Sequence, residues 1–202
     1  MQNKTSELVP SYREVTNELL GKYNNKNILL LAPDCNLALQ HVEREYFKDA
    51  HNNLIAIPDG DFFVWLDEYK RYVERKPFDV CIALRILEHI PLRQLDYLVY
   101  CLANVMKSGG ILHVVVPDMS KCVKQLIDEL KADVVDWFNV LRLNIEIFSE
   151  GDHVYDRHAT FTCEELIRYV LTKEGLFVIK SVTPIKLDTA ITPELYIVAV
   201  RV

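Results

Sequence analysis

Residues 149–161 hold the densest group of polar side chains in the sequence. The members that could do chemistry are Asp152, His153, Asp156, Arg157 and His158. Because imidazole titrates near neutral pH, His158 or His153 beside the carboxylate of Asp156 could act as a general base or bind a polar substrate. The same side chains would also suit a hydrated loop tip. Zinc bound by histidine and aspartate is a further alternative, against which their irregular spacing argues.

Two carboxylates form a second candidate site. Asp59 and Asp61 follow the apolar residues 54–57 in the sequence Pro-Asp-Gly-Asp. A carboxylate just past a strand can accept hydrogen bonds from ribose hydroxyls or from an adenine amino group, so both residues are candidates for binding a nucleoside. The alternative is that this sequence serves only as a tight turn, which proline, aspartate and glycine favour.

Both groups need a scaffold, and the apolar pattern predicts one. Residues 80–84 and 111–116 are short apolar runs rich in β-branched residues, as strands buried on both faces are. Between them apolar residues recur at helical spacing, with Pro91 near the start of the predicted helix and Gly109-Gly110 just past its end. A strand, a helix and a strand of these lengths predict a right-handed parallel crossover.

The same alternation continues on both sides of the crossover. Further strands are predicted at 27–31, 54–57, 176–182 and 196–202, and further helices at 36–48, 62–73 and 162–175. Ser11-Tyr12-Arg13-Glu14 is a capping box, which predicts a packing helix that ends at Gly21. The order of elements predicts an α/β protein.

The composition agrees with a single soluble domain. The chain has 202 residues, of which 50% are hydrophobic and 26% charged, enough for a substantial core. Its formal net charge of −6 argues against extensive contact with nucleic acid. The five cysteines form no CxxC motif, no apolar run reaches the length of a membrane span, and the first residues lack the layout of a signal peptide. We therefore expect a cytoplasmic protein without a membrane partner.

Three pieces of sequence around the crossover resemble a known family. They are Phe78-Asp79-Val80, Leu87-Glu88-His89-Ile90-Pro91, and Met106-Lys107-Ser108-Gly109-Gly110-Ile111-Leu112 with the following Val114-Val115-Val116-Pro117-Asp118. In this order and spacing they resemble the second half of class I S-adenosylmethionine-dependent methyltransferases, above all the small bacterial type-11-like group. The later segment from His158 to Leu166 is similar to the start of a late helix in that family.

The resemblance covers residues 27–202 and implies a methyltransferase-like domain there, with residues 1–26 as an N-terminal packing helix. The implied fold is Rossmann-like, with a doubly wound, mostly parallel sheet whose last strand is antiparallel. The implied cofactor is S-adenosylmethionine, and the implied reaction is methyl transfer to a small or carbohydrate-like acceptor. His158 or His153 would then be the base that takes the acceptor's proton.

The resemblance also implies where the cofactor is bound. The residues concerned are Ala83, Leu84 and Leu87 at the end of strand 80–84, and Ala32, Pro33 and Asp34 in the turn after strand 27–31. In the family this turn is rich in glycine, which lets the backbone approach the cofactor. Here it contains no glycine, and Pro33 has no N–H to donate. This departure supports a second hypothesis, a catalytically inactive module that acts through a protein partner.

The residues that follow strand 80–84 raise the question of a metal site. Some quinone methyltransferases carry Glu-x-x-Glu-His after this strand as a metal site. Arg85 stands at the first of these positions, which removes one ligand and adds a positive charge, so we expect no metal. Glu88 and His89 are then expected to form hydrogen bonds at the start of a helix. His113 lies inside an apolar strand and is expected to be a core residue whose ring nitrogens are both hydrogen-bonded.

Overall fold

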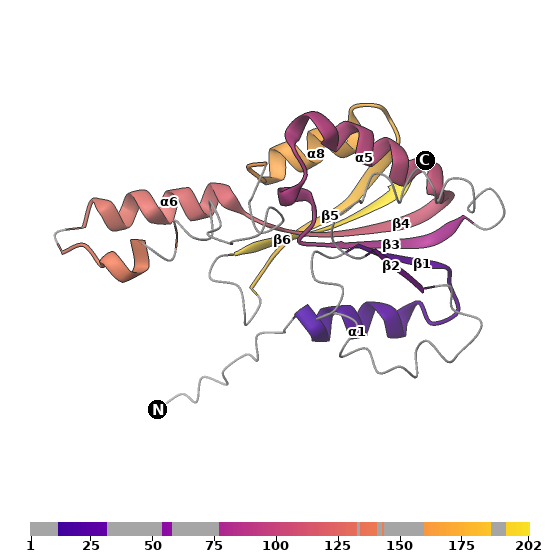
Figure 1. Cartoon of the computed structure of the whole chain (residues 1–202), viewed down its shortest axis with the longest axis horizontal. Helices are drawn as coiled ribbons and strands as arrows, with labels where there is room; N and C mark the ends of the chain where they lie inside the picture. Colours follow the sequence, from indigo (N-terminus) through magenta and orange to yellow (C-terminus); the bar gives the residue numbers. More distant parts are fainter. Residues whose placement is uncertain are drawn as a thin grey trace.

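A mostly parallel sheet forms the centre of the protein (Figure 1). The computed structural model describes residues 12–31, 54–57, 77–132, 134–140, 143, 160–186 and 193–202. The strands in these ranges are β1 (Ile28–Leu31), β2 (Leu54–Ile57), β3 (Phe78–Leu84), β4 (Met106–Pro117), β5 (Phe177–Ile185) and β6 (Glu194–Arg201). They lie in the order β2-β1-β3-β4-β6-β5, and β6 is antiparallel to both β4 and β5. The predicted doubly wound, mostly parallel α/β sheet with an antiparallel last strand is confirmed.

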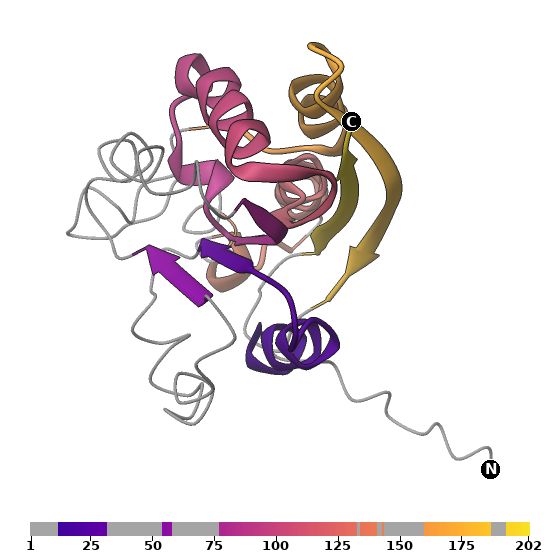
Figure 2. The same cartoon turned by 90° about the vertical axis from the view of Figure 1, so that its right-hand side faces the viewer.

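Helices cover both faces of this sheet. The helices whose bounds are described include α1 (Tyr12–Lys22), the short 3-10 helix η1 (Leu87–His89), α5 (Leu92–Val105), α6 (Met119–Leu130) and α8 (Glu164–Thr172), and residues 137–140 are also helical. The helices α5 and α8 lie on one face and α1 on the other, as Figure 2 shows. The helices predicted at 36–48 and 62–73 fall outside the described residues.

Alternation along the strands divides the apolar residues between two cores, because successive strand side chains point to opposite faces. The core under α5 and α8 includes Leu29, Leu31, Cys81, Ala83, Leu112 and Val114 from the strands, with Leu95, Leu98 and Ile167 from the helices. The core under α1 includes Ile28, Leu30, Val80, Ile82 and Val115 from the strands, with Leu19 and Leu20 from the helix. Leu19 and Leu20 of α1 therefore pack against this face of the sheet.

One strand begins earlier than the sequence predicts. The apolar run predicts a strand at 111–116, whereas β4 starts at Met106, directly after α5. The added residues contain a shift in the register between β3 and β4. Gly109 has φ 77°, and a Cβ at Gly110 would lie 2.8 Å from the carbonyl oxygen of Lys107. The glycine pair therefore belongs to an irregular part of the strand that other residues would not fit, rather than to a helix end.

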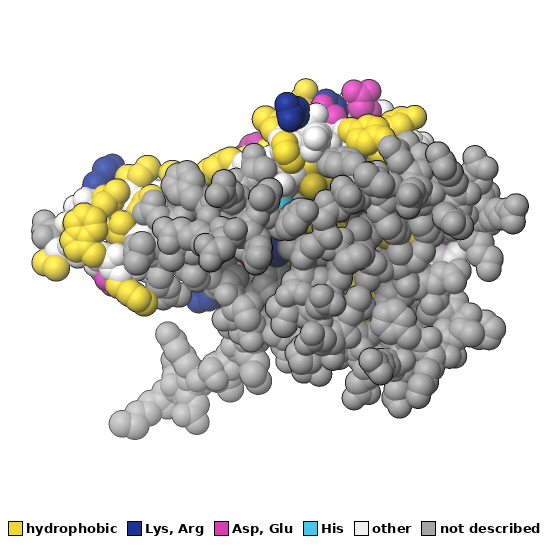
Figure 3. Space-filling view, viewed as in Figure 1, with side chains coloured by type: hydrophobic (Ala, Val, Ile, Leu, Met, Phe, Trp, Pro, Cys, Tyr) yellow, Lys and Arg dark blue, Asp and Glu magenta, His cyan; other side chains and the backbone are white. Residues whose placement is uncertain are grey.

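The helix α6 extends away from the sheet, on the left of Figure 1. Met119 and Cys122 near its start are buried, but Ile127 and Leu130 are 43% and 49% exposed. Figure 3 shows hydrophobic side chains gathered over this part of the surface. None of the helices within the described ranges combines the length and the hydropathy that a membrane span requires.

His113 lies in the core beneath α1, as the sequence predicts. Its side chain is 1% exposed, with Nδ1 2.7 Å from the hydroxyl of Tyr196 and Nε2 3.0 Å from the hydroxyl of Tyr23. A neutral imidazole has one donor and one acceptor nitrogen, so one tyrosine donates to the ring and the other accepts from it. Burial, together with the nearby charge of Lys22, lowers the pKa of His113 to about 4.

We predict that this histidine makes the fold sensitive to acid. The unfolded chain binds a proton near pH 6.5 and the folded chain only near pH 4, so the contribution to the free energy of unfolding is present above pH 6.5 and is lost between these values. The loss amounts to about 3 kcal/mol. Urea unfolding from pH 7 to pH 4 should show a steeper decline for the wild type than for His113→Gln, which keeps a donor and an acceptor but does not titrate. Parallel declines would contradict the prediction.

Candidate functional site

The parallel strands end at a common edge, and this edge contains the switch point of the sheet. The chain leaves β1 for β2 on one side and β3 for β4 on the other, so the switch point lies between β1 and β3. Leu31 at the end of β1 pairs with Ala83 near the end of β3. In open α/β sheets ligands bind just outside the carboxyl ends of the strands at such a point.

Three of the predicted cofactor-binding residues belong to this edge. Ala83 and Leu84 end β3 and Leu87 begins η1, and their exposed fractions are 0%, 4% and 2%. Ala83 and Leu87 belong to the core under α5 and α8, and Leu84 belongs to the core under α1, so apolar side chains lie on both sides of the sheet beside the switch point. The remaining predicted site residues fall outside the described residues; they are Ala32, Pro33, Asp34, Asp59, Asp61, His153, Asp156 and His158.

Arg85 follows β3 directly and has an uncommon backbone conformation. Its φ is 52°, the only positive value at a non-glycine residue in the described part of the chain. Such a conformation costs about 1–3 kcal/mol and persists only when the surroundings hold it. Here the backbone N–H of Arg85 donates to the carbonyl oxygen of Val115 on β4 at 2.8 Å. The left-handed residue therefore turns the chain out of β3 while it stays bonded to the neighbouring strand.

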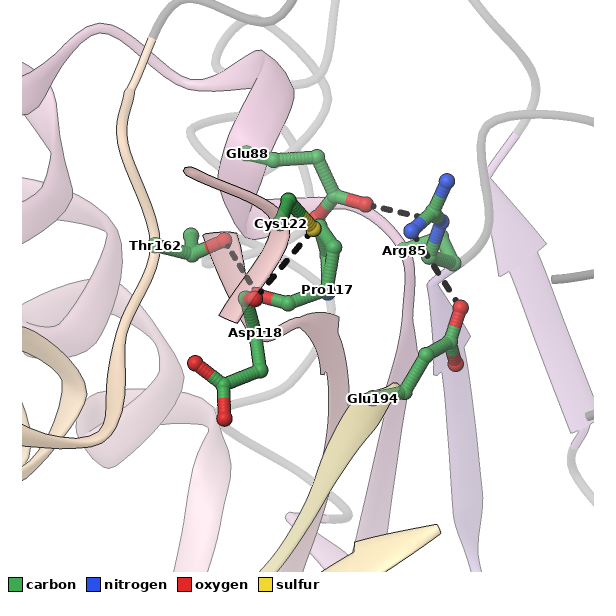
Figure 4. A network of polar contacts seen from close by, with 7 residues as sticks. All are labelled: Arg85, Glu88, Pro117, Asp118, Cys122, Thr162 and Glu194. Atoms are coloured by element: carbon green, nitrogen blue, oxygen red, sulfur yellow. Dashed lines mark hydrogen bonds and ion pairs between the residues drawn. The ribbon is translucent and has the colours of Figure 1, made fainter. Parts of the chain in front are cut away.

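Two buried carboxylates contact the Arg85 side chain (Figure 4). Its Nε lies 3.1 Å from Oε1 of Glu88, and its terminal nitrogen lies 3.2 Å from Oε1 of Glu194. Both glutamates are 0% exposed, whereas the arginine side chain is 22% exposed. Burial raises the pKa of Glu194 to about 8. The edge therefore carries a charged group that is largely withdrawn from water.

A second polar group surrounds the end of β4. Asp118 accepts hydrogen bonds from Oγ of Ser120 at 2.5 Å and from Nζ of Lys121 at 2.7 Å. Burial alone would raise the pKa of Asp118, but these two hydrogen bonds outweigh it and leave the pKa below its ordinary value. The backbone N–H of Asp118 donates to the carbonyl oxygen of Pro193 at 3.0 Å, which ties the start of α6 to the start of β6.

Two threonines fasten the segment before α8 to the same edge. The backbone N–H of Thr160 donates to the carbonyl oxygen of Glu88 at 3.0 Å, and its hydroxyl donates to that of Ile90 at 2.5 Å. The hydroxyl of Thr162 donates to the carbonyl oxygen of Pro117 at 2.8 Å (Figure 4). The described end of residues 149–161 therefore lies beside η1, at the edge where the strands end.

Sequence reasoning did not identify the charged group around Arg85. From the sequence, Arg85 was expected only to replace a metal ligand, and Glu194 was not among the predicted site residues. The available signal was a charged residue directly beside an apolar strand, in Leu84-Arg85 and in Glu194-Leu195. A charge placed there is buried unless the strand end is open to water, and a buried charge requires a partner.

Comparison with known proteins identifies the fold. No protein-family model matches the chain, and no curated protein matches it. Solved methyltransferases do match. The N-methyltransferase NodS from Bradyrhizobium japonicum, solved with S-adenosyl-L-homocysteine, has a TM-score of 0.54 at 12% identity, and the match covers 96% of this chain and 89% of NodS.

Two further structures agree. The 1,6-didemethyltoxoflavin-N1-methyltransferase from Burkholderia thailandensis, solved with 1,6-didemethyltoxoflavin and S-adenosylhomocysteine, has a TM-score of 0.53 at 12% identity, covering 94% of this chain and 77% of that one. An S-adenosylmethionine-dependent methyltransferase from Clostridium acetobutylicum has a TM-score of 0.52 at 15% identity, covering 92% and 90%. The chain therefore has the fold of the class I S-adenosylmethionine-dependent methyltransferases.

We predict that the Thr162 hydroxyl contributes to stability because it is buried. Thr162→Val keeps the shape but removes the donor to the Pro117 carbonyl oxygen, which should lower the free energy of unfolding by about 1–3 kcal/mol. Thr172→Val is the matched control, because its hydroxyl also donates to a backbone oxygen at 2.8 Å but is exposed. Water replaces that bond, so the change should stay within about 0.5 kcal/mol. Equal losses in urea unfolding would refute the distinction.

Proposed function

We propose that the protein is an S-adenosylmethionine-dependent methyltransferase that acts on a small or carbohydrate-like acceptor. The observation that supports this most is the switch point between β1 and β3, in a fold shared with solved methyltransferases. The apolar residues Ala83, Leu84 and Leu87 beside it suit the adenosine part of the cofactor. The charged group around Arg85 gives the same edge a polar side.

In this proposal the protein mainly binds and aligns. The bound cofactor supplies a methyl group that its sulfonium already activates. Asp59 and Asp61 would accept hydrogen bonds from the ribose hydroxyls or the adenine amino group, and Ala32, Pro33 and Asp34 would lie beside the cofactor. Alignment of the acceptor for in-line attack then accounts for most of the rate.

The acceptor's proton requires a base, and we assign this role to His158 or His153, with Asp156 as the carboxylate beside it. Support comes from Thr160, which is bonded to Glu88 and Ile90 at the carboxyl edge. His158 precedes Thr160 by two residues, and two residues of extended chain span about 7 Å at most. This connection favours His158 over His153.

We predict that His158→Ala lowers turnover far more than stability. Loss of a general base reduces turnover by about a hundredfold to ten-thousandfold, whereas a polar substitution away from the core changes the free energy of unfolding by about 0.5 kcal/mol or less. Release of S-adenosylhomocysteine with a panel of small acceptors measures the first quantity, and urea unfolding measures the second. His153→Ala is the matched variant. Unchanged turnover in His158→Ala would show that His158 is not the general base. A large loss of turnover in His153→Ala would assign that role to His153 instead.

We also predict that S-adenosylmethionine binds more weakly than it does to relatives with a glycine-rich turn. Pro33 offers no backbone donor, and the side chains of residues 32–35 hold the backbone further from a ligand. One or two lost hydrogen bonds at about 0.5–1.5 kcal/mol each weaken binding by roughly tenfold to a hundredfold. Calorimetry with S-adenosylmethionine and S-adenosylhomocysteine measures the dissociation constants.

Asp61→Ala is the specificity control in this experiment, because it removes a carboxylate that is proposed to bind the nucleoside. Micromolar binding by the wild type would show that the turn needs no glycine. Absence of binding heat at millimolar ligand would contradict the proposal that the protein is a methyltransferase. It would favour the second candidate, an inactive module with a protein partner, for which the glycine-free turn is the supporting observation.

A further inference from the structure

We propose that Glu194 is a positioning residue for the cofactor, which acts through Arg85 on the end of β3. This inference rests on the proposed function. Glu194 does not belong to the strands that form the switch point, and it is not among the residues that the resemblance implies for the cofactor. Its contact with Arg85 makes it the link between the last strand and the residues expected to touch the nucleoside.

The position of Glu194 makes this link possible. It is the first residue of β6 and pairs with Pro117, the last residue of β4. Because β6 is antiparallel, its first residue lies at the edge where the parallel strands end. β4 lies between β3 and β6 in the sheet, so the contact between Arg85 and Glu194 crosses the end of β4. It joins the residue that follows β3 to the first residue of β6, although these two strands are not neighbours; Figure 4 draws the two side chains and their contact.

The conformation of Arg85 depends on these contacts. A non-glycine residue at φ 52° persists only when its surroundings hold it. Three described contacts do so, one from the backbone of Val115 and one each from Glu88 and Glu194. Arg85 stands between Leu84 and Leu87, so its conformation sets the direction in which the chain leaves β3. A change at Glu194 is therefore transmitted to Leu84 and Leu87, the neighbours of Arg85 that are proposed to contact the cofactor.

Stability alone gives little reason for such an arrangement. A buried ion pair loses so much hydration that apolar residues of similar volume often replace it without loss of stability. Burial raises the pKa of Glu194, which reflects this cost. The cost is understandable if the contact fixes one geometry at the binding edge rather than adding to the stability of the sheet.

A second ion pair, at the other end of β3, provides a control. Asp79 lies near the start of β3, at the opposite edge of the sheet, where Oδ1 accepts from Nζ of Lys107 at 2.7 Å and Oδ2 accepts from the backbone N–H of Asn27 at 2.9 Å. Burial would raise the pKa of Asp79, but these hydrogen bonds outweigh it and lower the pKa. This pair connects strand ends where no ligand is expected, so its role is structural.

The first test compares Glu194→Gln with Asp79→Asn. Each change replaces a carboxyl group by an amide of the same shape, which keeps one oxygen acceptor. The dissociation constant of S-adenosylhomocysteine is measured by calorimetry, and the free energy of unfolding by urea. We expect Glu194→Gln to weaken binding by about tenfold, which corresponds to about 1.4 kcal/mol. Asp79→Asn should lower stability and leave the dissociation constant within about twofold of the wild type.

The second test asks whether Glu194 acts through Arg85. Glycine adopts φ 52° without strain, so Arg85→Gly keeps the backbone conformation accessible and removes the side chain. Arg85→Gly should also weaken binding, and Glu194→Gln should then have no further effect in that background. This variant also decides the matter if Glu194→Gln does not fold. Unchanged binding in Arg85→Gly, or additive losses in the double variant, would overturn the proposal.

The outcomes separate this inference from the proposed function. If the wild type binds S-adenosylhomocysteine and Glu194→Gln binds equally well, the positioning role is overturned and the proposed cofactor stands. If Asp79→Asn weakens binding as much as Glu194→Gln does, the effect is a general loss of sheet integrity and the positioning role is again overturned. If the wild type itself gives no heat, both the proposed function and this inference fail.

Discussion

The hydrogen bonds between β3 and β4 are the interaction on which the rest of the sheet depends. These two strands lie side by side in the middle of the sheet, with helices over both faces, so water cannot replace the hydrogen bonds between their backbone groups. From Val80 to Leu84 their pairing is continuous, and Val80, Cys81, Ile82 and Ala83 are each 1% exposed or less. A buried N–H or carbonyl group without a partner costs about as much as a lost hydrogen bond. All the hydrogen bonds between these two strands must therefore form together. The paired strands also separate the two apolar cores.

This constraint also determines what happens where the strands end. The ladder stops at Leu84, and the next residue has to redirect the chain into η1 while its N–H remains bonded to Val115. Arg85 does so in a left-handed conformation, and its side chain then crosses β4 to reach Glu194. The polar contacts of the edge follow from the apolar pairing beneath it: carboxylates and hydroxyls gather where the carbonyl and amide groups of the strands are no longer paired with one another.

Much of the fold could be predicted from the sequence, because its signals are local. Apolar runs at 80–84 and 111–116 and the helical repeat between them define the crossover, and the position of His113 in such a run predicts its buried role. The early start of β4 could not be predicted, since a glycine pair after a helical repeat is also typical of a helix end. The contact between Arg85 and Glu194 could not be predicted either, because no spacing rule connects residues so far apart in the chain. For Ala83, Leu84 and Leu87 the structure gives a position at the expected edge, while their cofactor role and the roles of the histidines stay predictions.

The order of strands in the sheet differs from their order of synthesis, and this has a consequence for how the chain folds as it leaves the ribosome. β5 is made before β6, yet β6 lies between β4 and β5. When β5 emerges, its place in the sheet has no neighbour to pair with, and it joins only after β6 has paired with β4. Until then the outer edge of β4 is open, with Val114 and Val116 beside unpaired backbone groups. An open apolar edge of this kind is where nascent chains associate with one another. Pairing of β6 with β4 therefore closes an edge that would otherwise favour association between chains.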